Sequence, residues 1–232
     1  MKILVGTPTY NGQLTTNYTG SLLALWSELG DRLDWKTTSG TLVAWARNTL
    51  ASLVLASDHT HLLFIDSDID FPPELIRRMV EFDAPIVSAV CPHRTLDVRR
   101  FHSMAREYPD PGAAWARSLS FILELQEPRI ERDGFYRATR TGTGLMLIKR
   151  EVFETLKAAC PELYRPAAGT YYAFQGLTHV LQCFDPAYDE NGVTMGEDVS
   201  FCRRWRATGG ELWVVFDETV GHVGPFVFRA AL

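Results

Sequence analysis

The first 90 residues alternate short strand-like runs with helix-forming segments, and this alternation constrains the fold more than any other feature. Strands are predicted at 2–7, 33–38, 61–65 and 85–90, and helices at 14–29, 42–56 and 72–82. Apolar strands that alternate with helices are typical of a parallel sheet covered on both faces. We therefore predict an α/β fold with a mostly parallel central sheet and helices on both faces.

The rest of the chain continues this pattern after one interruption. Prolines and a glycine break up residues 91–117, where we predict a long irregular loop. Beyond it the sequence predicts strands at 119–125, 135–139, 145–148 and 211–216, and helices at 151–159 and 196–209.

Composition excludes several classes of protein. The 28 acidic side chains outnumber the 23 basic ones, and the net charge of −5 disfavours a protein that coats nucleic acid. The four cysteines form no CxxC pair, which argues against a zinc site or a disulfide scaffold. No apolar run reaches the roughly 18 residues of a membrane span, and the first residues do not resemble a signal peptide. We expect a cytoplasmic protein.

The strongest chemical signal is the carboxylate cluster in LLFIDSDID. Asp66, Asp68 and Asp70 follow the third strand, and ligands of open α/β sheets bind beyond the carboxyl ends of strands. Like charges this close repel one another unless a cation neutralises them, and oxygen ligands suit Mg²⁺ or Mn²⁺. The alternative is a solvated turn in which Asp70 or Ser67 caps the helix at Pro72.

Two later motifs carry further candidate groups. Glu197 and Asp198 follow Gly196 at a predicted helix start, where a carboxylate serves either as a general base or as a helix cap. His222 lies between two glycines in the run VGHVG after the last predicted strand. A single histidine of this kind is either a metal ligand or a packed core residue.

The order of these pieces matches a known family. The matching segments are TPTYNG after the first strand, Ala46-Arg47-Asn48, LLFIDSDIDFPPELI, GTGLMLIKREVFE, and GEDVSFCRRWRATGG followed by GHVG. In this order they resemble the GT-A glycosyltransferases of the family-2 type. The resemblance implies one GT-A domain over 1–232, with a Rossmann-like nucleotide-binding half at 1–90 and an acceptor and catalytic half at 91–232.

The resemblance also implies roles for individual residues. A nucleotide-sugar site would be formed by Pro8, Thr9, Tyr10, Arg47, Asp66, Ser67, Gly142 and Gly144. Tyr10 would flank the base, and Asp66 would face the ribose or the uracil. Asp68, with Asp66 and His222, would hold Mn²⁺ or Mg²⁺ at the diphosphate. Asp198, beside Glu197, would be the catalytic base of an inverting reaction.

The expected function is a metal-dependent, hexosyltransferase-like glycosyltransferase that uses a nucleotide-diphosphate sugar, UDP-linked, and an acceptor of unknown class. Residues 35–40 lack the aspartate with which many relatives bind the nucleotide base, so the sequence does not determine which base the donor carries. One alternative is a nucleotidyltransferase of similar fold, but TPTYNGQ lacks the glycine-rich phosphate loop that this reaction needs. The other is a non-catalytic module that binds a nucleotide sugar or a glycan.

The acceptor is the least defined part of this function. The stretch 91–117 carries five arginines against three acids and lies where this family places acceptor-recognising segments. It would suit a glycan, a small molecule or a phosphate-bearing acceptor, including a modified nucleic acid, or it is a solvated variable loop. Nineteen of the 23 basic residues are arginine, a bias that phosphate binding or a GC-rich genome would explain.

Overall fold

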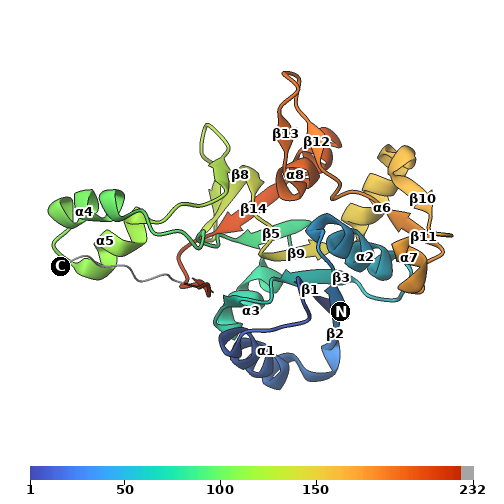
Figure 1. Cartoon of the computed structure of the whole chain (residues 1–232), viewed down its shortest axis with the longest axis horizontal. Helices are drawn as coiled ribbons and strands as arrows, with labels where there is room; N and C mark the ends of the chain where they lie inside the picture. The colour runs from blue at the N-terminus through green and yellow to red at the C-terminus, as the bar shows by residue number, and fades with distance from the viewer. Residues whose placement is uncertain (226–232) are drawn as a thin grey trace.

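A mixed nine-stranded sheet forms the centre of the computed structural model, which describes residues 1–225 (Figure 1). The strands are β1 (Ile3–Thr9), β2 (Leu33–Ser39), β3 (His61–Ile65), β5 (Ile86–Ala89), β6 (Leu123–Leu125), β7 (Glu131–Arg132), β8 (Phe135–Thr141), β9 (Leu145–Lys149) and β14 (Leu212–Val215). Their order is β2-β1-β3-β9-β5-β14-β8-β6, and β7 pairs with β8.

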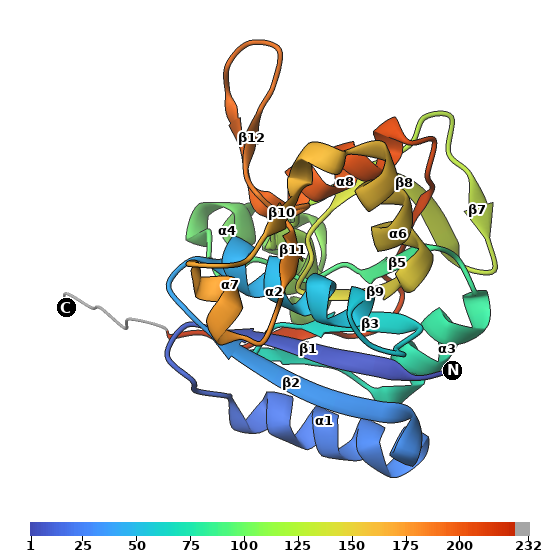
Figure 2. The same ribbon diagram turned by 90° about the vertical axis from the view of Figure 1, so that its right-hand side faces the viewer.

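The helices lie on both faces of this sheet, as Figure 2 shows for α1 on one side and α2, α6 and α8 on the other. Their bounds are α1 (Thr16–Leu29), α2 (Val43–Leu55), α3 (Pro73–Phe82), α4 (Val98–Glu107), α5 (Pro111–Ser118), α6 (Arg150–Ala159), α7 (Tyr171–Phe174) and α8 (Glu197–Ala207). Within residues 1–225, no helix combines the length and the apolar character that crossing a bilayer requires.

Three short strand pairs lie outside the sheet. They are β4 (Ile69–Asp70) with β15 (Gly221–His222), β10 (Tyr164–Pro166) with β11 (His179–Leu181), and β12 (Ala187–Tyr188) with β13 (Thr194–Met195). The β12–β13 hairpin projects from the body of the molecule at the top of Figure 2. The first pair matters most for function, because it joins the acidic turn to the histidine near the end of the chain.

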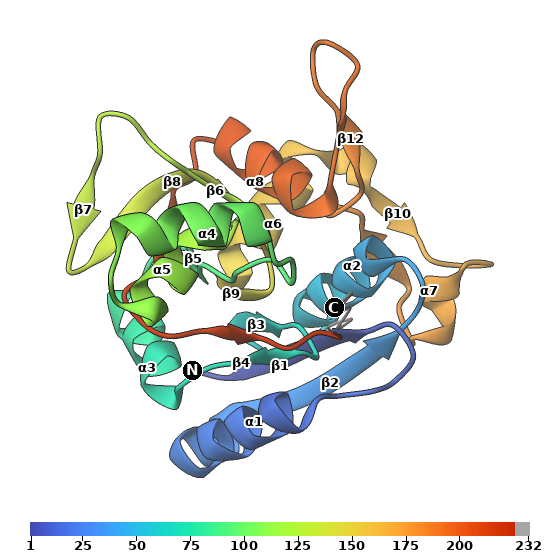
Figure 3. The same cartoon turned by 60° about the vertical axis from the view of Figure 1, so that its left-hand side comes forward.

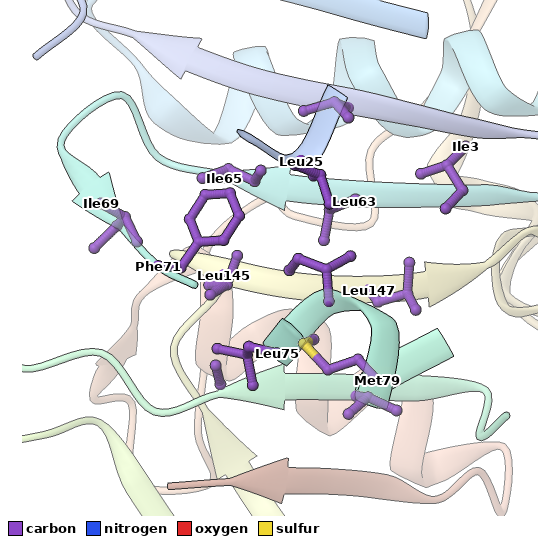
Figure 4. Packing of buried hydrophobic residues seen from close by; sticks show 14 of the residues in the cluster. Ile3, Leu25, Leu63, Ile65, Ile69, Phe71, Leu75, Met79, Leu145 and Leu147 are labelled. Carbon is purple, nitrogen blue, oxygen red and sulfur yellow. The ribbon is translucent and has the colours of Figure 1, made fainter. Parts of the chain in front are cut away.

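The hydrophobic core consists of two clusters, one on each face of the sheet. In β3, Leu63 and Ile65 point to the cluster under α1 and α3, which Figure 4 shows. Leu62 and Phe64 point to the cluster under α2, α6 and α8. Because successive side chains of a strand point to opposite faces, a strand covered on both sides is apolar at every position. This explains the unbroken apolar run that predicted the strand.

The predicted elements of the first 90 residues are confirmed, but the sheet is mixed rather than mostly parallel. β1 pairs in parallel with β2 and β3, and β5 with β14. β9 lies antiparallel between β3 and β5, and the pairings of β8 are all antiparallel. A buried strand needs apolar residues on both faces whichever way it runs, so its own sequence does not reveal its direction.

The predicted loop at 91–117 is wrong, because this stretch contains α4 and α5 (Figure 3). The side chain of Asp97 accepts a hydrogen bond from the Arg100 amide at 3.0 Å, and that of Asp110 accepts one from the Ala113 amide at 2.6 Å. Both aspartates are therefore N-caps, and Pro111 is at the first helical position. The predicted strand 119–125 is shorter than expected and forms only at 123–125.

Candidate active site

The acidic loop begins where β3 ends, and backbone hydrogen bonds fold it into a tight turn. The Asp66 amide donates to Gly144 O at 2.8 Å, and the Ile69 amide donates to Asp66 O at 3.0 Å. β4 then pairs antiparallel with β15, which places His222 opposite Ile69. Two segments about 150 positions apart in the chain are thereby joined at the carboxyl end of β3, the edge where α/β proteins bind ligands.

Helix capping does not explain these acids. α3 starts after Pro72, and no side chain makes a hydrogen bond at its N-cap. Asp70 instead lies against Gly221, where a Cβ would overlap its carboxylate. The Asp70 carboxylate also accepts a hydrogen bond from Asn17 Nδ2 at 3.4 Å. The Asp70 carboxylate is therefore engaged between α1 and β15, and the other two acids are left for the site.

Arg47, on α2, is almost fully buried and joins three segments of the site. Its Nη2 donates to both carboxylate oxygens of Asp66, at 3.0 and 3.1 Å, and its Nη1 donates to Thr143 O at 3.2 Å. Its Nε lies 3.5 Å from Glu197 Oε1 at the start of α8. A guanidinium shared by two carboxylates neutralises part of their charge, which lets Asp66 and Glu197 lie close together.

Asp68 lies between an arginine and a histidine. Arg94 Nη1 donates to Asp68 Oδ2 at 2.5 Å, and His222 Nε2 lies 3.4 Å from Asp68 Oδ1. His222 Nδ1 lies 2.7 Å from Pro92 O, a carbonyl that can only accept, so Nδ1 carries a proton. Burial by itself lowers the pKa of His222, but its hydrogen bonds to Asp68 and Pro92 outweigh burial and raise the pKa.

Asp68 and His222 fit a divalent cation. In neutral His222 the Nε2 lone pair faces Asp68 Oδ1, and two acceptors 3.4 Å apart repel unless a proton or a cation lies between them. Two ligands at right angles, each about 2.1 Å from one ion, are about 3 Å apart. Metal-binding histidines normally donate their other ring N–H to a carbonyl or a carboxylate, as His222 does.

The protein supplies only part of such a coordination shell. Residues 1–225 contain no group of three His, Cys, Asp or Glu side chains placed to hold a metal. Both oxygens of Asp66 accept from Arg47, which leaves one lone pair on each for the predicted metal contact. Mg²⁺ commonly uses one or two protein ligands with substrate phosphates and water. Asp68 and His222 would therefore hold the ion together with a phosphate-bearing ligand.

Asp198 and Glu197 occupy the first turn of α8, whose N-cap is Gly196. Asp198 is 8% exposed, and its Oδ1 accepts a hydrogen bond from the Val199 amide at 2.7 Å. Burial, together with the nearby charge of Glu197, raises the pKa of Asp198. A carboxylate with a raised pKa is a stronger base than an ordinary one.

A pocket of about 220 Å³ lies between the acidic loop with His222 and the loop after β1. Seven of the residues that line it were predicted as site residues: Pro8, Thr9, Tyr10, Asp66, Ser67, Asp68 and His222. The other five were not predicted as site residues: Gly40, Thr41, Val43, Ala46 and Arg94. Arg94 was missed because it lies in the stretch predicted as a loop, with no spacing that relates it to Asp68. Tyr10 is 74% exposed at the pocket, as a ring that covers a planar ligand would be.

The other predicted residues lie outside the pocket lining. Arg47 contacts Asp66 of the lining, Glu197 contacts Arg47, and Asp198 follows Glu197 on α8. Gly142 and Gly144 flank Thr143 in the turn between β8 and β9. Within residues 1–225, Thr143 Oγ1 and Arg47 Nε are buried without a hydrogen-bond partner. Arg47 Nε nevertheless lies 3.5 Å from Glu197 Oε1, so of these two atoms the Thr143 hydroxyl is the one available to a polar ligand beside Asp66.

The fold and the pocket define an α/β protein with an acidic ligand site at the carboxyl end of β3. A family model described as Anp1 matches residues 33–149, half of the chain. The chain therefore belongs to the Anp1 family. The matched residues include Arg47, Asp66, Asp68 and Arg94.

Several solved structures are similar to this chain at low sequence identity. A197 from STIV has a TM-score of 0.49 and 14% identity over 100% of this chain and 99% of its own. TarS 1–349 of S. aureus in complex with UDP has a TM-score of 0.47 and 14% sequence identity. The match covers 95% of this chain and 59% of the TarS chain. The same protein in complex with UDP-GlcNAc has a TM-score of 0.48 and 12% sequence identity. This match covers 99% of this chain and 60% of the TarS chain. No curated protein matches the sequence.

Proposed function

We propose that this protein is a glycosyltransferase that takes its sugar from a nucleotide-diphosphate donor with a divalent cation, Mn²⁺ or Mg²⁺. The observation that carries the proposal is the contact between Asp68 Oδ1 and His222 Nε2. The other ring nitrogen, Nδ1, carries the proton and donates it to Pro92 O, which leaves the Nε2 lone pair for a cation. This pair lines a pocket that Tyr10 also lines. Membership of the Anp1 family supports the same class of reaction.

The chain provides a distinct group for each part of the donor. The exposed ring of Tyr10 would stack on the base, and UDP is the nucleotide that we propose. Asp68 and His222 would hold the cation, which would offset the charge of the diphosphate leaving group. Arg94, which lies at the same carboxylate, would donate to a diphosphate oxygen. The Thr143 hydroxyl, which has no hydrogen-bond partner within residues 1–225, would meet a sugar hydroxyl beside Asp66.

Asp198 is the proposed base. In the reaction the acceptor oxygen forms a bond to the anomeric carbon, the bond from that carbon to the diphosphate breaks, and the acceptor proton passes to the Asp198 carboxylate. Attack from the face opposite the leaving group inverts the anomeric centre. Because its pKa is raised, the Asp198 carboxylate is a stronger base than an ordinary aspartate.

Calorimetric titration with UDP and with GDP, each with Mn²⁺ or with a chelator, tests this proposal. We expect UDP binding that needs the cation and that weakens at least tenfold in Asp68→Asn and in His222→Gln, because each variant removes one of two protein ligands. Asp58→Asn is the matched control, since Asp58 is an exposed aspartate paired with Lys2.

The proposal also predicts turnover. Wild-type protein with a UDP-sugar and Mn²⁺ should release UDP, and Asp198→Asn should bind UDP normally but release it far more slowly. Failure of both UDP and GDP to bind with Mn²⁺ present would overturn the proposal. Unchanged binding by Asp68→Asn would do the same.

A further inference from the structure

The helices α4 and α5 form a hairpin that lies outside the central sheet, at the left of Figure 1 and in front in Figure 3. No residue of α4 is buried. The two helices are held together by Phe101, whose ring packs edge-on against Trp115 with ring centroids 5.9 Å apart. The core does not need this unit, so its exposed side is available for another role.

The exposed side of α4 is cationic. Arg99 and Arg106 lie two turns apart on one face with His102 between them, Arg100 lies on a different face of the helix, and all four side chains are exposed. Within residues 1–225, no carboxylate lies within 4.0 Å of any of these three guanidinium groups. Of the three acids in 91–117, Asp97 and Asp110 are engaged as helix caps, and Glu107 is exposed at the last position of α4. In a protein of net charge −5, this face is a local site for anions.

The hairpin leads directly to the candidate active site. A cavity of about 270 Å³ lies between α5 and β15, and its lining includes Trp115, Arg94 and His222. Arg94 and His222 also line the candidate donor pocket. Trp115, on α5 of the hairpin, therefore shares one cavity with two residues of the candidate cation site.

Exposed aromatic rings line the same path. Trp115, Phe121 and Phe216 are 45%, 42% and 46% exposed, and all three line a larger cavity of about 710 Å³ that also includes Arg117. Unpaired arginines beside exposed aromatic rings are the combination with which proteins bind single-stranded nucleic acid, through phosphate contacts and base stacking. A polyanion without bases would use the arginines but leave the rings unused.

We infer that the acceptor is carried on a single-stranded nucleic acid, with its phosphates at the α4 arginines and its bases against Trp115 and Phe121. The inference rests on the proposed function and names its substrate class. The acceptor would be a ribose hydroxyl or a hydroxyl on a modified base. Its oxygen bonds to the anomeric carbon, its proton passes to Asp198, and the nucleoside diphosphate leaves.

Fluorescence anisotropy with labelled single-stranded RNA and DNA over a series of KCl concentrations tests the inference. Each lost phosphate contact should reduce the salt slope by about 0.7, so Arg99→Gln/Arg106→Gln should reduce it by about 1.4. Trp115→Ala should weaken binding about 5- to 150-fold and leave the slope unchanged. Arg165→Gln is the matched control, since Arg165 is exposed on β10 and forms no ion pair within residues 1–225.

Three outcomes would overturn the inference: no salt-sensitive binding, a double variant that behaves like Arg165→Gln, or equal binding of heparin with no effect of Trp115→Ala. The last outcome would identify a polyanion without bases. The double variant changes only exposed side chains, so it remains informative if Trp115→Ala unfolds the hairpin. Titration of the wild type with UDP and Mn²⁺ separates the two proposals. If UDP binds but single-stranded nucleic acid does not, the nucleic-acid inference is wrong and the proposed function stands.

Discussion

The small size of Gly221 lets β15 lie against β4, and this pairing places His222 where it faces Asp68. A Cβ at this position would overlap the Asp70 carboxylate, although the backbone itself is unstrained. We expect Gly221→Ala to displace His222 and to weaken UDP binding in the presence of Mn²⁺ at least tenfold, as measured by calorimetry.

A second substitution distinguishes this clash from a general loss of stability. Asp70→Ala removes the atoms that the new methyl group meets, so the double variant with Gly221→Ala should recover most of the nucleotide affinity. Gly20→Ala is the control, because a Cβ there meets nothing within 4 Å. Failure of Asp70→Ala to restore binding would show that the methyl group acts in another way.

Asp198 couples the proposed reaction to stability through its raised pKa. The base must be ionised, so kcat/KM should fall on the acid side at a pH above the ordinary Asp value of about 3.9. A pKa that is higher in the folded protein than in the unfolded chain means that stability is lost as pH rises through the folded pKa. Asp198→Asn should therefore be inactive yet more resistant to urea than wild type at pH 7.

The stability difference has a defined pH dependence. It should shrink as pH falls below the ordinary pKa of aspartate, because the group is then protonated in both states. Glu190→Gln, on the β12–β13 hairpin, provides a control with the same loss of charge. A wild type that is more stable than Asp198→Asn at pH 7 would contradict the assignment of a raised pKa.

At the scale of elements, the α4–α5 hairpin is the part of the fold that should open independently. Asp97→Ala removes the N-cap of α4, which typically costs about 1 kcal/mol. Because no residue of α4 is buried, we expect faster hydrogen exchange over 98–118 with little change in the melting temperature of the whole protein. Glu107→Ala, on the same helix but not at a cap, is the control. Uniformly faster exchange throughout the sheet would contradict a local opening.

The elements also show what the sequence could and could not predict. The strand β3 was predictable from its unbroken apolar run, and the helix α2 from apolar residues that recur at helical spacing. The sequence analysis missed α4 and α5 because it interpreted the prolines of this stretch as signs of a loop, although Asp97 and Asp110 are N-caps. The direction of β9 and the contact of Arg94 with Asp68 depend on tertiary pairing, which leaves no local pattern. The candidate site residues Asp66, Asp68 and His222 were identified by order and type, and the structure brought them together.

At the scale of the whole molecule, the order of the sheet makes the two halves of the chain interdependent. β9 lies between β3 and β5, and β14 lies on the other side of β5. Residues 1–90 alone would therefore leave β3 and β5 without their shared neighbour and would expose the apolar side chains of both strands. These apolar faces would have no covering from α6 or α8.

We therefore expect a fragment of residues 1–90 to show no cooperative thermal transition by circular dichroism, whereas the full chain unfolds in a single step. Its exposed strand edges should also make it aggregate. Mixing it with a fragment of residues 91–232 should restore the near-ultraviolet signal, because β9 and β14 then supply the missing neighbours. A sharp transition in the first fragment alone would show that β1, β2 and β3 with their helices are a self-sufficient unit, and that the inserted strand is not required for folding.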